Sequence, residues 1–357
     1  KVAGVLGTTH SRAMQRSTVL LYLPLWLVAA NDAEWRQFTD VGAPSSRQWM
    51  SAVYASSVKK IFTFGGGEDC CNSSLTKDDM FAFSVSGRSW EDLTGSDADK
   101  PPTRLGAGMA YDGSDKIYLH GGLQLWGASH DLYSYEISTG DWVNLTGSMT
   151  GGGPQQKVWH SLVHVSGDLY SYAGASPYGT GTNGAFSSAD MWKYTISSGA
   201  WTQISPATMP WARLQGGMVY TNSQGTDYLV IFGGLYFDGS TGGYLNDLWL
   251  FDVAAGTFAQ QNPSGTGPTA RGGFGMSTIP YNDEDQIVIY GGVDFSTYYD
   301  DLYAYSMLWS AWTPITPANA AERPPARCCM AFPRASYDGA ADGFQEDQIF
   351  TIGGEGL

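Results

Sequence analysis

The chain has 357 residues and a formal net charge of −15, with 46 glycines, 14% aromatic residues and only 15% charged residues. This composition is typical of an all-β protein with many turns, and it argues against disorder. The negative charge would repel a polyanion, so we expect no nucleic-acid partner.

An apolar stretch at residues 17–30 follows a basic flank and ends in Val-Ala-Ala. This layout is that of a secretory signal, and a run of about 14 residues is too short for a direct membrane span. A second interpretation also stays open. Residues 25–35 align with residues 248–258, which indicates a β-strand instead. We therefore divide the chain into an N-terminal segment, 1–30, and one further domain, 31–357.

From Trp35 onward, four short sequence motifs, which we call phrases, recur at a spacing of roughly 50–60 residues. The most regular phrase is a run of alternating β-formers that ends in two glycines. It occurs at residues 61–66, 116–122, 229–234, 287–292 and 349–354, with a variant at 169–174 that ends in Ala-Gly. The β-formers suit a buried strand, and the glycine pair lets the backbone turn and approach a neighbour where a Cβ would be excluded.

The other three phrases recur with it. One is a basic residue before a strand of small residues: Arg47, Arg104, Lys157, Arg213, Arg271 and Arg327. Another is an Asp followed by alternating apolar and aromatic residues, beginning at Asp79, Asp131, Asp190, Asp247 and Asp301. The last is a strand led by Trp90, Trp142, Trp201, Phe258 or Trp312. Four strands per unit form a small sheet whose two apolar faces must be buried against neighbouring copies.

This set of phrases resembles the kelch repeat over nearly all of the chain from Trp35 onward, through its Gly-Gly pairs, its aromatic residues and its Trp. The resemblance implies a β-propeller. Complete blades are expected at roughly 46–95, 102–147, 155–205, 211–262 and 269–316. A sixth would combine residues 324–354 with residues 35–38. We therefore expect an all-β, six-bladed β-propeller of four-stranded antiparallel blades, its ring closed by pairing N- and C-terminal strands.

The third blade departs from this pattern, because its glycine pair is Ala173-Gly174 and a long Gly/Ser-rich loop extends from there to Ser188. We expect a locally irregular blade at this position.

The six basic residues of the repeat are the first candidate site. Each opens the strand nearest the axis, so the series is expected to ring one mouth of the central channel, with Trp159 and His160 beside it. One interpretation is a ring that binds a carboxylate. The other is that each cation caps loop carbonyls or pairs with a neighbouring acid. Trp126, Tyr178 and Tyr236 are expected in nearby loops, where they would supply aromatic contact area.

The cysteines and two glycosylation sequons bear on location. The residues concerned are Cys70, Cys71, Cys328 and Cys329, with Asn72 and Asn144 as sequon asparagines. The cysteines show no CxxC spacing, so no zinc site is expected. The kelch resemblance places the two vicinal pairs in neighbouring blades, where we expect one disulfide across the seam. Disulfides and sequons favour a secreted or cell-surface protein, and a cytoplasmic location is the alternative.

We expect a non-catalytic module that binds a protein or a carbohydrate through loops on one face. The five histidines are too scattered to propose a metal set, and no phosphate loop or nucleophile elbow occurs, so no catalytic residue, metal or cofactor is expected. Two alternatives are an enzyme with a site at the axial mouth, similar to the copper radical oxidases, and an intracellular kelch scaffold or adaptor. For the oxidase, this sequence offers no isolated Cys with suitable Tyr and His partners.

Overall fold

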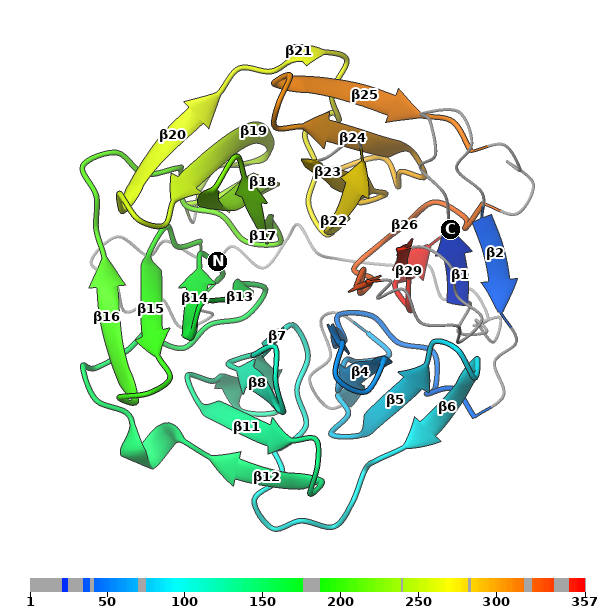
Figure 1. Cartoon of the computed structure of the whole chain (residues 1–357), viewed down its shortest axis with the longest axis vertical. Helices are drawn as coiled ribbons and strands as arrows, with labels where there is room; N and C mark the ends of the chain where they lie inside the picture. Colours follow the sequence, from blue (N-terminus) through cyan, green and yellow to red (C-terminus); the bar gives the residue numbers. More distant parts are fainter. Residues whose placement is uncertain are drawn as a thin grey trace.

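The computed structural model describes residues 21–24, 35–38, 42–69, 75–175, 187–238, 240–281, 284–317, 323–336 and 347–356. Their strands stand radially around a central axis, with the first strand of each blade innermost (Figure 1). The arrangement is an all-β propeller. No helix in the described residues combines the length and apolar character needed to cross a membrane.

Five sheets repeat the same antiparallel order from axis to rim. Blade 1 contains β3 (Ser51–Ala55), β4 (Lys60–Phe64), β5 (Met80–Ser84) and β6 (Ser89–Asp92). Blade 2 contains β7 (Gly108–Tyr111), β8 (Lys116–His120), β11 (Leu132–Glu136) and β12 (Asp141–Asn144), followed by a 3-10 turn at Thr146–Ser148. A small hairpin of β9 (Leu123–Gln124) and β10 (Gly127–Ala128) extends from its second loop.

The next three blades follow the same scheme. Blade 3 contains β13 (Ser161–Val165), β14 (Asp168–Tyr172), β15 (Met191–Thr195) and β16 (Ala200–Ile204). Blade 4 contains β17 (Gly217–Ser223), β18 (Thr226–Phe237), β19 (Gly242–Asp252) and β20 (Thr257–Gln261). Blade 5 contains β22 (Gly275–Tyr281), β23 (Glu284–Tyr290), β24 (Leu302–Ser306) and β25 (Ala311–Ile315), with β21 (Ser264–Gly265) added in parallel at its rim.

The expectation of a six-bladed ring was wrong, because the structure has five four-stranded blades. The space between blades 5 and 1 holds three separate two-stranded pairs. They are β1 (Leu21–Pro24) with β2 (Trp35–Phe38), β26 (Arg327–Cys328) with β29 (Glu355–Gly356), and β27 (Arg334–Ala335) with β28 (Gln348–Ile349). Among the described strands, no ladder joins the N-terminal pair to the C-terminal ones, so the ring is not closed by pairing terminal strands. We call these three pairs the sixth sector.

Blade 3 is more regular than its sequence predicted. β13 to β16 pair in the common order without a register shift, and only the loop at 176–186 lies outside the described residues. The variant Ala173 adopts a left-handed φ of 63°, in the range of the first glycine of the other pairs. An L-residue tolerates this conformation at a cost of roughly 1–2 kcal/mol, so the substitution strains the turn without breaking the sheet.

The sheets are held together by apolar side chains packed between neighbouring blades. Phe62 and Phe64 of blade 1 meet Tyr135 and Trp142 of blade 2, for example. The Trp of the fourth phrase packs on an aromatic ring of the third strand, as in the Tyr135–Trp142 pair with ring centroids 5.1 Å apart. The sixth sector is buried in the same way on both sides, against blade 5 and against blade 1. Each sheet face is thus covered by its neighbour, which is what a small two-faced sheet requires.

Backbone hydrogen bonds also link the sectors around the axis. In each sector, the second residue after the basic residue has a left-handed φ, and its N–H donates to the equivalent carbonyl of a neighbouring sector at 2.6–3.0 Å. The six residues are Trp49, Gly106, Trp159, Gln215, Gly273 and Cys329, and the series is cyclic. We call it the axial circle. It includes the sixth sector even though that sector lacks a continuous sheet.

A second set of bonds explains the glycine pairs. The N–H of the second glycine donates to the carbonyl of the basic residue in the next sector, as from Gly66 to Arg104 at 2.9 Å and from Gly354 to Arg47 at 3.0 Å. The first glycine is close to the same carbonyl. A Cβ on Gly65 would lie 2.4 Å from the Arg104 oxygen, and both glycines have positive φ. The glycines therefore permit contact between sectors as well as the turn itself.

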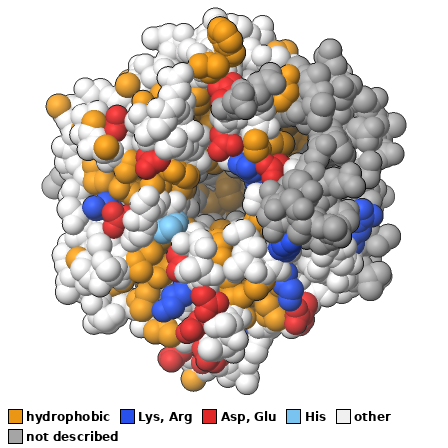
Figure 2. Space-filling model, viewed as in Figure 1, with side chains coloured by type: hydrophobic (Ala, Val, Ile, Leu, Met, Phe, Trp, Pro, Cys, Tyr) orange, Lys and Arg blue, Asp and Glu red, His pale blue; other side chains and the backbone are white. Residues whose placement is uncertain are grey.

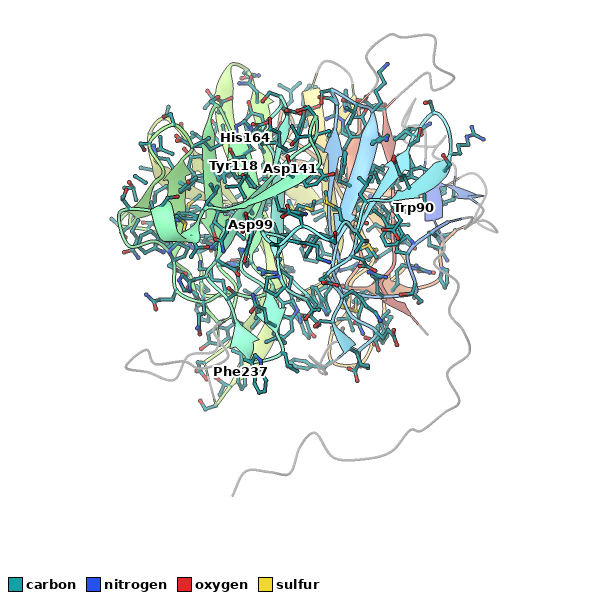
Figure 3. All side chains as sticks on the ribbon, turned by 90° about the horizontal axis from the view of Figure 1, so that it is seen from below. Trp90, Asp99, Tyr118, Asp141, His164 and Phe237 are labelled. Carbon is teal, nitrogen blue, oxygen red and sulfur yellow. A yellow bond between two sulfur atoms is a disulfide. The ribbon has the colours of Figure 1, made fainter. Side chains whose placement is uncertain are left out.

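The disc has two distinct faces. The view in Figure 2 shows a hollow at the centre of one face, with hydrophobic side chains visible inside it. In the perpendicular view of Figure 3, His164 lies toward one face and Phe237 at the other. The glycine pairs and the basic residues lie at the face of Phe237, because the second strand of each blade runs toward that face and ends at its glycine pair. We call it the mouth face.

Candidate functional site

Buried ion pairs surround the mouth of the channel. Arg104 is 1% exposed and makes bidentate contacts to Asp131 at 2.6 and 3.0 Å, while its Nη1 also donates to the carbonyl of Gly121 at 2.8 Å. Arg213 repeats this arrangement with Asp247 and the carbonyl of Gly233, all at 2.8 Å. In blade 2 the Asp directly precedes the third strand and the glycine directly follows the second, and in blade 4 both lie within these strands, so one guanidinium joins three strands of its own blade.

The same unit recurs in other blades. Arg47 pairs with Asp79, and Arg271 pairs with Asp301. Lys157 is the variant in blade 3, and its Nζ donates to Asp190 at 2.8 Å. Arg327 in the sixth sector donates to the carbonyl of Gly353 at 2.9 Å. Pairing with a neighbouring acid, one of the two interpretations that the sequence allowed, is therefore the geometry of the first five cations.

Protonation states within these units follow from burial and pairing. Burial raises the pKa of Asp131, but the hydrogen bonds and charge of Arg104 outweigh it and hold that pKa below its ordinary value. Arg213 does the same for Asp247. Burial lowers the pKa of Lys157, and the charge of Asp190 opposes this. Asp131 and Asp247 are thus ionised near neutral pH, and the cations that pair with them are engaged within the fold.

Two tryptophans lie at the mouth within the axial circle. The rings of Trp49 and Trp159 have centroids 5.7 Å apart, on either side of Gly106. A Cβ on Gly106 would lie 2.7 Å from Cδ1 of Trp159, so the absence of a side chain at 106 makes room for the indole. Residues of the axial circle and the positions that follow them line a cavity of about 100 Å³.

Three residues that line this cavity have a buried polar atom without a partner in the described part of the chain. The indole Nε1 atoms of Trp49 and Trp159 and the Nδ1 of His160 are buried without a hydrogen-bond partner among the described residues. All three residues line the cavity. A buried polar atom without a partner is costly, so these atoms indicate a place for a hydrogen-bonding ligand or a water.

His160 is also paired with His120. Nε2 of His160 and Nδ1 of His120 are 3.0 Å apart, and the rings meet edge to face. Burial, with the nearby positive charge of Lys157, lowers the pKa of His120 to about 3. Burial also lowers the pKa of His160, so the pair is neutral near pH 7. Within the described residues, no group of three or more His, Cys, Asp or Glu side chains is placed to hold a metal.

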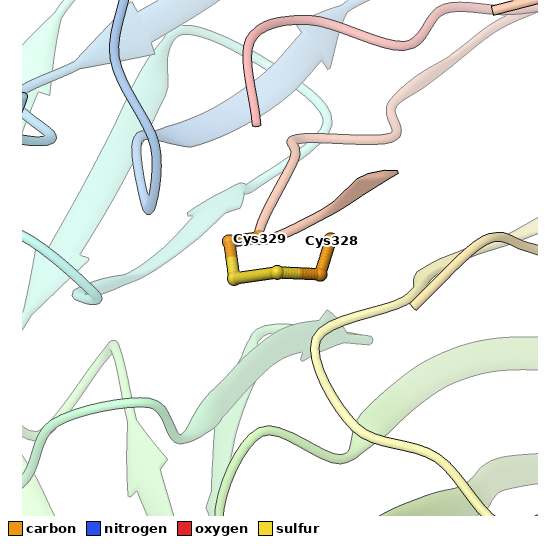
Figure 4. The surroundings of a disulfide bond; sticks show 2 residues. All are labelled: Cys328 and Cys329. Carbon is orange, nitrogen blue, oxygen red and sulfur yellow. A yellow bond between two sulfur atoms is a disulfide. The ribbon is translucent and has the colours of Figure 1, made fainter. Parts of the chain in front are cut away.

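The cysteines at the mouth pair locally. Cys328 and Cys329 are joined to one another by a disulfide in the structure (Figure 4). The sequence led us to expect a bridge from this pair to Cys70 or Cys71 across the seam, but those two residues lie outside the described ones. Cys329 belongs to the axial circle and Cys328 to β26, so the disulfide lies where the sixth sector meets blade 5.

The remaining predicted residues are spread over the mouth face and the rim. Trp126 is 87% exposed in the β9–β10 hairpin, and Tyr236 packs on Trp211 with ring centroids 5.3 Å apart. Asn144 is exposed on β12, the outermost strand of blade 2. Tyr178 and Asn72 lie outside the described residues. Sequence reasoning missed Trp49 and Gln215, although each stands two residues after a repeat cation, which is the signal that would have found them.

Comparison with known proteins identifies the family. A sequence model described as the attractin/LZTR1 β-propeller matches residues 117–327, which is more than half of the chain. The chain belongs to the attractin/LZTR1 β-propeller family. This agrees with the kelch-type propeller that the repeat predicted, and Kelch domain-containing protein 10 of Xenopus laevis is 27% identical over 156 residues, covering 42% of this chain and 35% of that protein.

Two further relatives differ in kind. A protein of Thlaspi arvense named N-(sulfonatooxy)prop-2-enimidothioate sulfolyase is 24% identical over 303 residues, covering 84% of this chain and 70% of the relative. Multiple epidermal growth factor-like domains protein 8 of Mus musculus is 26% identical over 232 residues, which cover 62% of this chain but only 8% of the relative. The chain therefore matches a small part of some relatives, and their names leave both catalysis and cellular location open.

Proposed function

We propose that this propeller is a non-catalytic binding module that recognises a segment of another protein at its axial mouth. One observation carries the proposal: Trp49, Trp159 and His160 all line a single cavity, and each has a buried ring nitrogen without a partner among the described residues. Carbonyl or carboxylate oxygens of a protein segment would satisfy the two indole N–H groups, while the indole rings supply apolar contact area. The attractin/LZTR1 β-propeller family and the similarity to a kelch-domain protein are consistent with this role.

In this proposal the basic residues have a supporting function. Arg47, Arg104, Lys157, Arg213 and Arg271 are held by Asp carboxylates, and each also fixes one end of an innermost strand. They keep the axial circle in shape, and Trp159 and His160 contact the partner. A carbohydrate partner remains the second candidate, because exposed indole rings also stack on sugars.

The test uses a random peptide display library selected on the wild-type chain, followed by affinity measurement of the enriched peptides. Trp159→Phe removes the indole N–H and keeps an aromatic ring, so we expect roughly tenfold weaker binding, the usual cost of leaving a buried polar partner unpaired. Trp309→Phe is the matched control, because Trp309 is 75% exposed in the β24–β25 turn on the opposite face. Selected peptides that bind both variants equally would contradict the proposal.

Catalysis is tested separately. The similarity to a sulfolyase over most of the chain makes that relative's named compound the first substrate to try. We expect no sulfate release from N-(sulfonatooxy)prop-2-enimidothioate above a heat-denatured control. Release that disappears in a Trp159→Phe or His160→Ala variant would show that the mouth is an active site instead.

We also propose that the protein is secreted or exposed at the cell surface. The Cys328–Cys329 disulfide, the exposed Asn144 sequon and the similarity to a protein with epidermal growth factor-like domains support this location. Intact mass measured before and after reduction and deglycosylation of protein from its natural source tests it. Free thiols together with an unmodified Asn144 would favour an intracellular role.

A further inference from the structure

Among the described residues, blade 4 has the longest hairpin on the mouth face. β18 and β19 have 12 and 11 residues, whereas β4 and β5 in blade 1 have five each. Their pairing continues beyond the glycine pair as far as Phe237 opposite Gly242. This hairpin arm therefore stands above the mouth face, and Figure 3 shows Phe237 at its far edge.

The side of the arm that faces blade 5 is aromatic. Tyr244 on β19 lies close to Gly272, where a Cβ would be 3.1 Å from Cε1 of Tyr244 and 3.3 Å from Oε1 of Gln215. Tyr244 also meets Phe295 edge to face, with ring centroids 4.9 Å apart. Gln215 lines the mouth cavity. Gln215, Tyr244 and Phe295 thus form a continuous line from the mouth outward over blades 4 and 5, which we call the aromatic track.

Phe295 is held in an exposed position by its loop. Its side chain is 76% exposed, although burial of a Phe is normally favourable. The preceding Asp294 accepts hydrogen bonds from the N–H groups of Ser296 at 2.7 Å and Thr297 at 2.8 Å, and from the Tyr299 hydroxyl at 2.6 Å. These bonds order the loop before any partner arrives, which reduces the entropy cost of binding through Phe295.

The loops beside the track are acidic. Residues 233–247 and 291–301 contain five Asp and no Lys, Arg or His. Asp247, Asp300 and Asp301 pair with arginines. Asp238 and Asp294 bond only to hydroxyl and backbone N–H donors among the described residues, and these bonds lower the pKa of both. Asp294, next to Phe295, therefore places an uncompensated negative charge at the track, on a chain with a net charge of −15.

The chemistry of this carboxylate favours a peptide over a glycan. Asp294 is held in its ionised form by hydrogen bonds from its own loop, and its charge acts at a distance on a cation, which a peptide can supply and a neutral sugar cannot. Lys and Arg side chains also interact favourably with exposed aromatic rings, and their charge would complement the loops.

We propose that the aromatic track binds an extended segment of a partner protein in which apolar side chains alternate with Lys or Arg. The apolar side chains pack on Tyr244 and Phe295, and the cations lie beside Asp294. The inference rests on the proposed binding function of the mouth face, and it names the partner chemistry and a second contact region outside the cavity.

The test compares synthetic, fluorescently labelled 12-residue peptides by anisotropy: one alternating Leu and Lys, one alternating Leu and Glu, and one alternating Leu and Ser. We expect the Lys peptide to bind at least roughly tenfold more tightly than the Glu peptide, and to weaken as salt rises. Phe295→Ala and Tyr244→Ala should each weaken it roughly tenfold, as expected for aromatic contact residues. The matched controls Trp211→Ala, 64% exposed on the other side of the arm, and Trp309→Ala, on the opposite face, should leave it unchanged.

Several results would overturn the proposal. One is equal binding of the Lys and Glu peptides. Another is a loss of affinity for the Lys peptide in the Trp309→Ala control that equals the loss in Phe295→Ala. Binding of an oligosaccharide array that depends on Phe295 would identify a glycan site. Self-association abolished by Phe295→Ala would identify a second copy as the occupant. Failure of the mouth proposal is distinguishable, because Trp159→Phe would then have no effect on display-selected peptides while Phe295→Ala still weakened the Lys peptide.

Discussion

The five complete blades and the sixth sector make the same backbone hydrogen bonds at the axis, although the sixth sector has no four-stranded sheet. In the blades, four strands pair in one sheet, and a buried Arg or Lys is fixed by the Asp that opens the third strand. In the sixth sector, three two-stranded pairs replace the sheet. Yet Cys329 takes its place in the axial circle, and Gly354 donates to Arg47 like every other second glycine. The difference shows that contacts at the axis do not depend on a complete blade.

Breaking a buried ion pair should give the largest effect. Asp247→Asn leaves Arg213, which is 1% exposed, without its counter-charge, and replaces one of the two oxygens that accept from Arg213 and the Trp249 indole by an NH2 group. We expect a loss of roughly 3–5 kcal/mol in the free energy of unfolding, measured by denaturant titration. Glu91→Gln is the control. It breaks an exposed pair with Lys60 and should cost about 1 kcal/mol or less. Equal losses of unfolding free energy in the two variants would show that the buried Arg213–Asp247 pair does not stabilise the blade more than an exposed pair does.

A smaller loss is expected when the contact between sectors is crowded. Gly353→Ala places a Cβ 2.5 Å from the carbonyl oxygen of Arg47, at a φ of 68°. Gly113→Ala introduces a comparable left-handed alanine, at a φ of 84°, with open space around it. The control should lose roughly 1 kcal/mol from backbone strain, and Gly353→Ala should lose clearly more because of the clash. Thermal melting of both variants makes the comparison, and equal losses would mean that the sixth sector does not contact blade 1 in this way.

The smallest expected change is an increase in stability. Ala173 occupies the first position of the glycine pair in blade 3 with a φ of 63°. Ala173→Gly relieves this strain but increases the entropy of the unfolded chain, so we expect a net stabilisation of roughly 0.5–1 kcal/mol. A destabilised variant, seen as a lower midpoint of thermal unfolding, would show that the Ala173 methyl packs favourably enough to outweigh the strain.

The sequence predicted the blades because each strand contributes a local pattern. The alternating run before each glycine pair and the Trp that opens the outer strand recur at a regular spacing, and both lie where expected. Pairing of each repeat cation with a neighbouring acid was one of the two interpretations that the sequence allowed, and one basic residue and one Asp do recur in each of the five complete units.

Other features had no such local signal. The sixth sector carries the repeat motifs at Arg327 and at 349–354, but these motifs do not show that its strands, of two to four residues, stay in three separate pairs. The aromatic track depends on the extra length of β18 and β19, and on Tyr244 meeting Phe295 across a blade boundary. Contacts between residues of different blades follow from the ring geometry and cannot be deduced from either segment alone.

Amide hydrogen exchange, followed residue by residue, tests the central claim most directly. If the axial contacts hold the sixth sector as they hold the blades, the N–H groups of Cys329 and Gly354 should exchange as slowly as those of Gly106 and Gly66, their equivalents in the axial circle and the glycine pairs. Fast exchange at Cys329 and Gly354, with protection retained at Gly106 and Gly66, would contradict the account and show that the sixth sector opens independently of the ring.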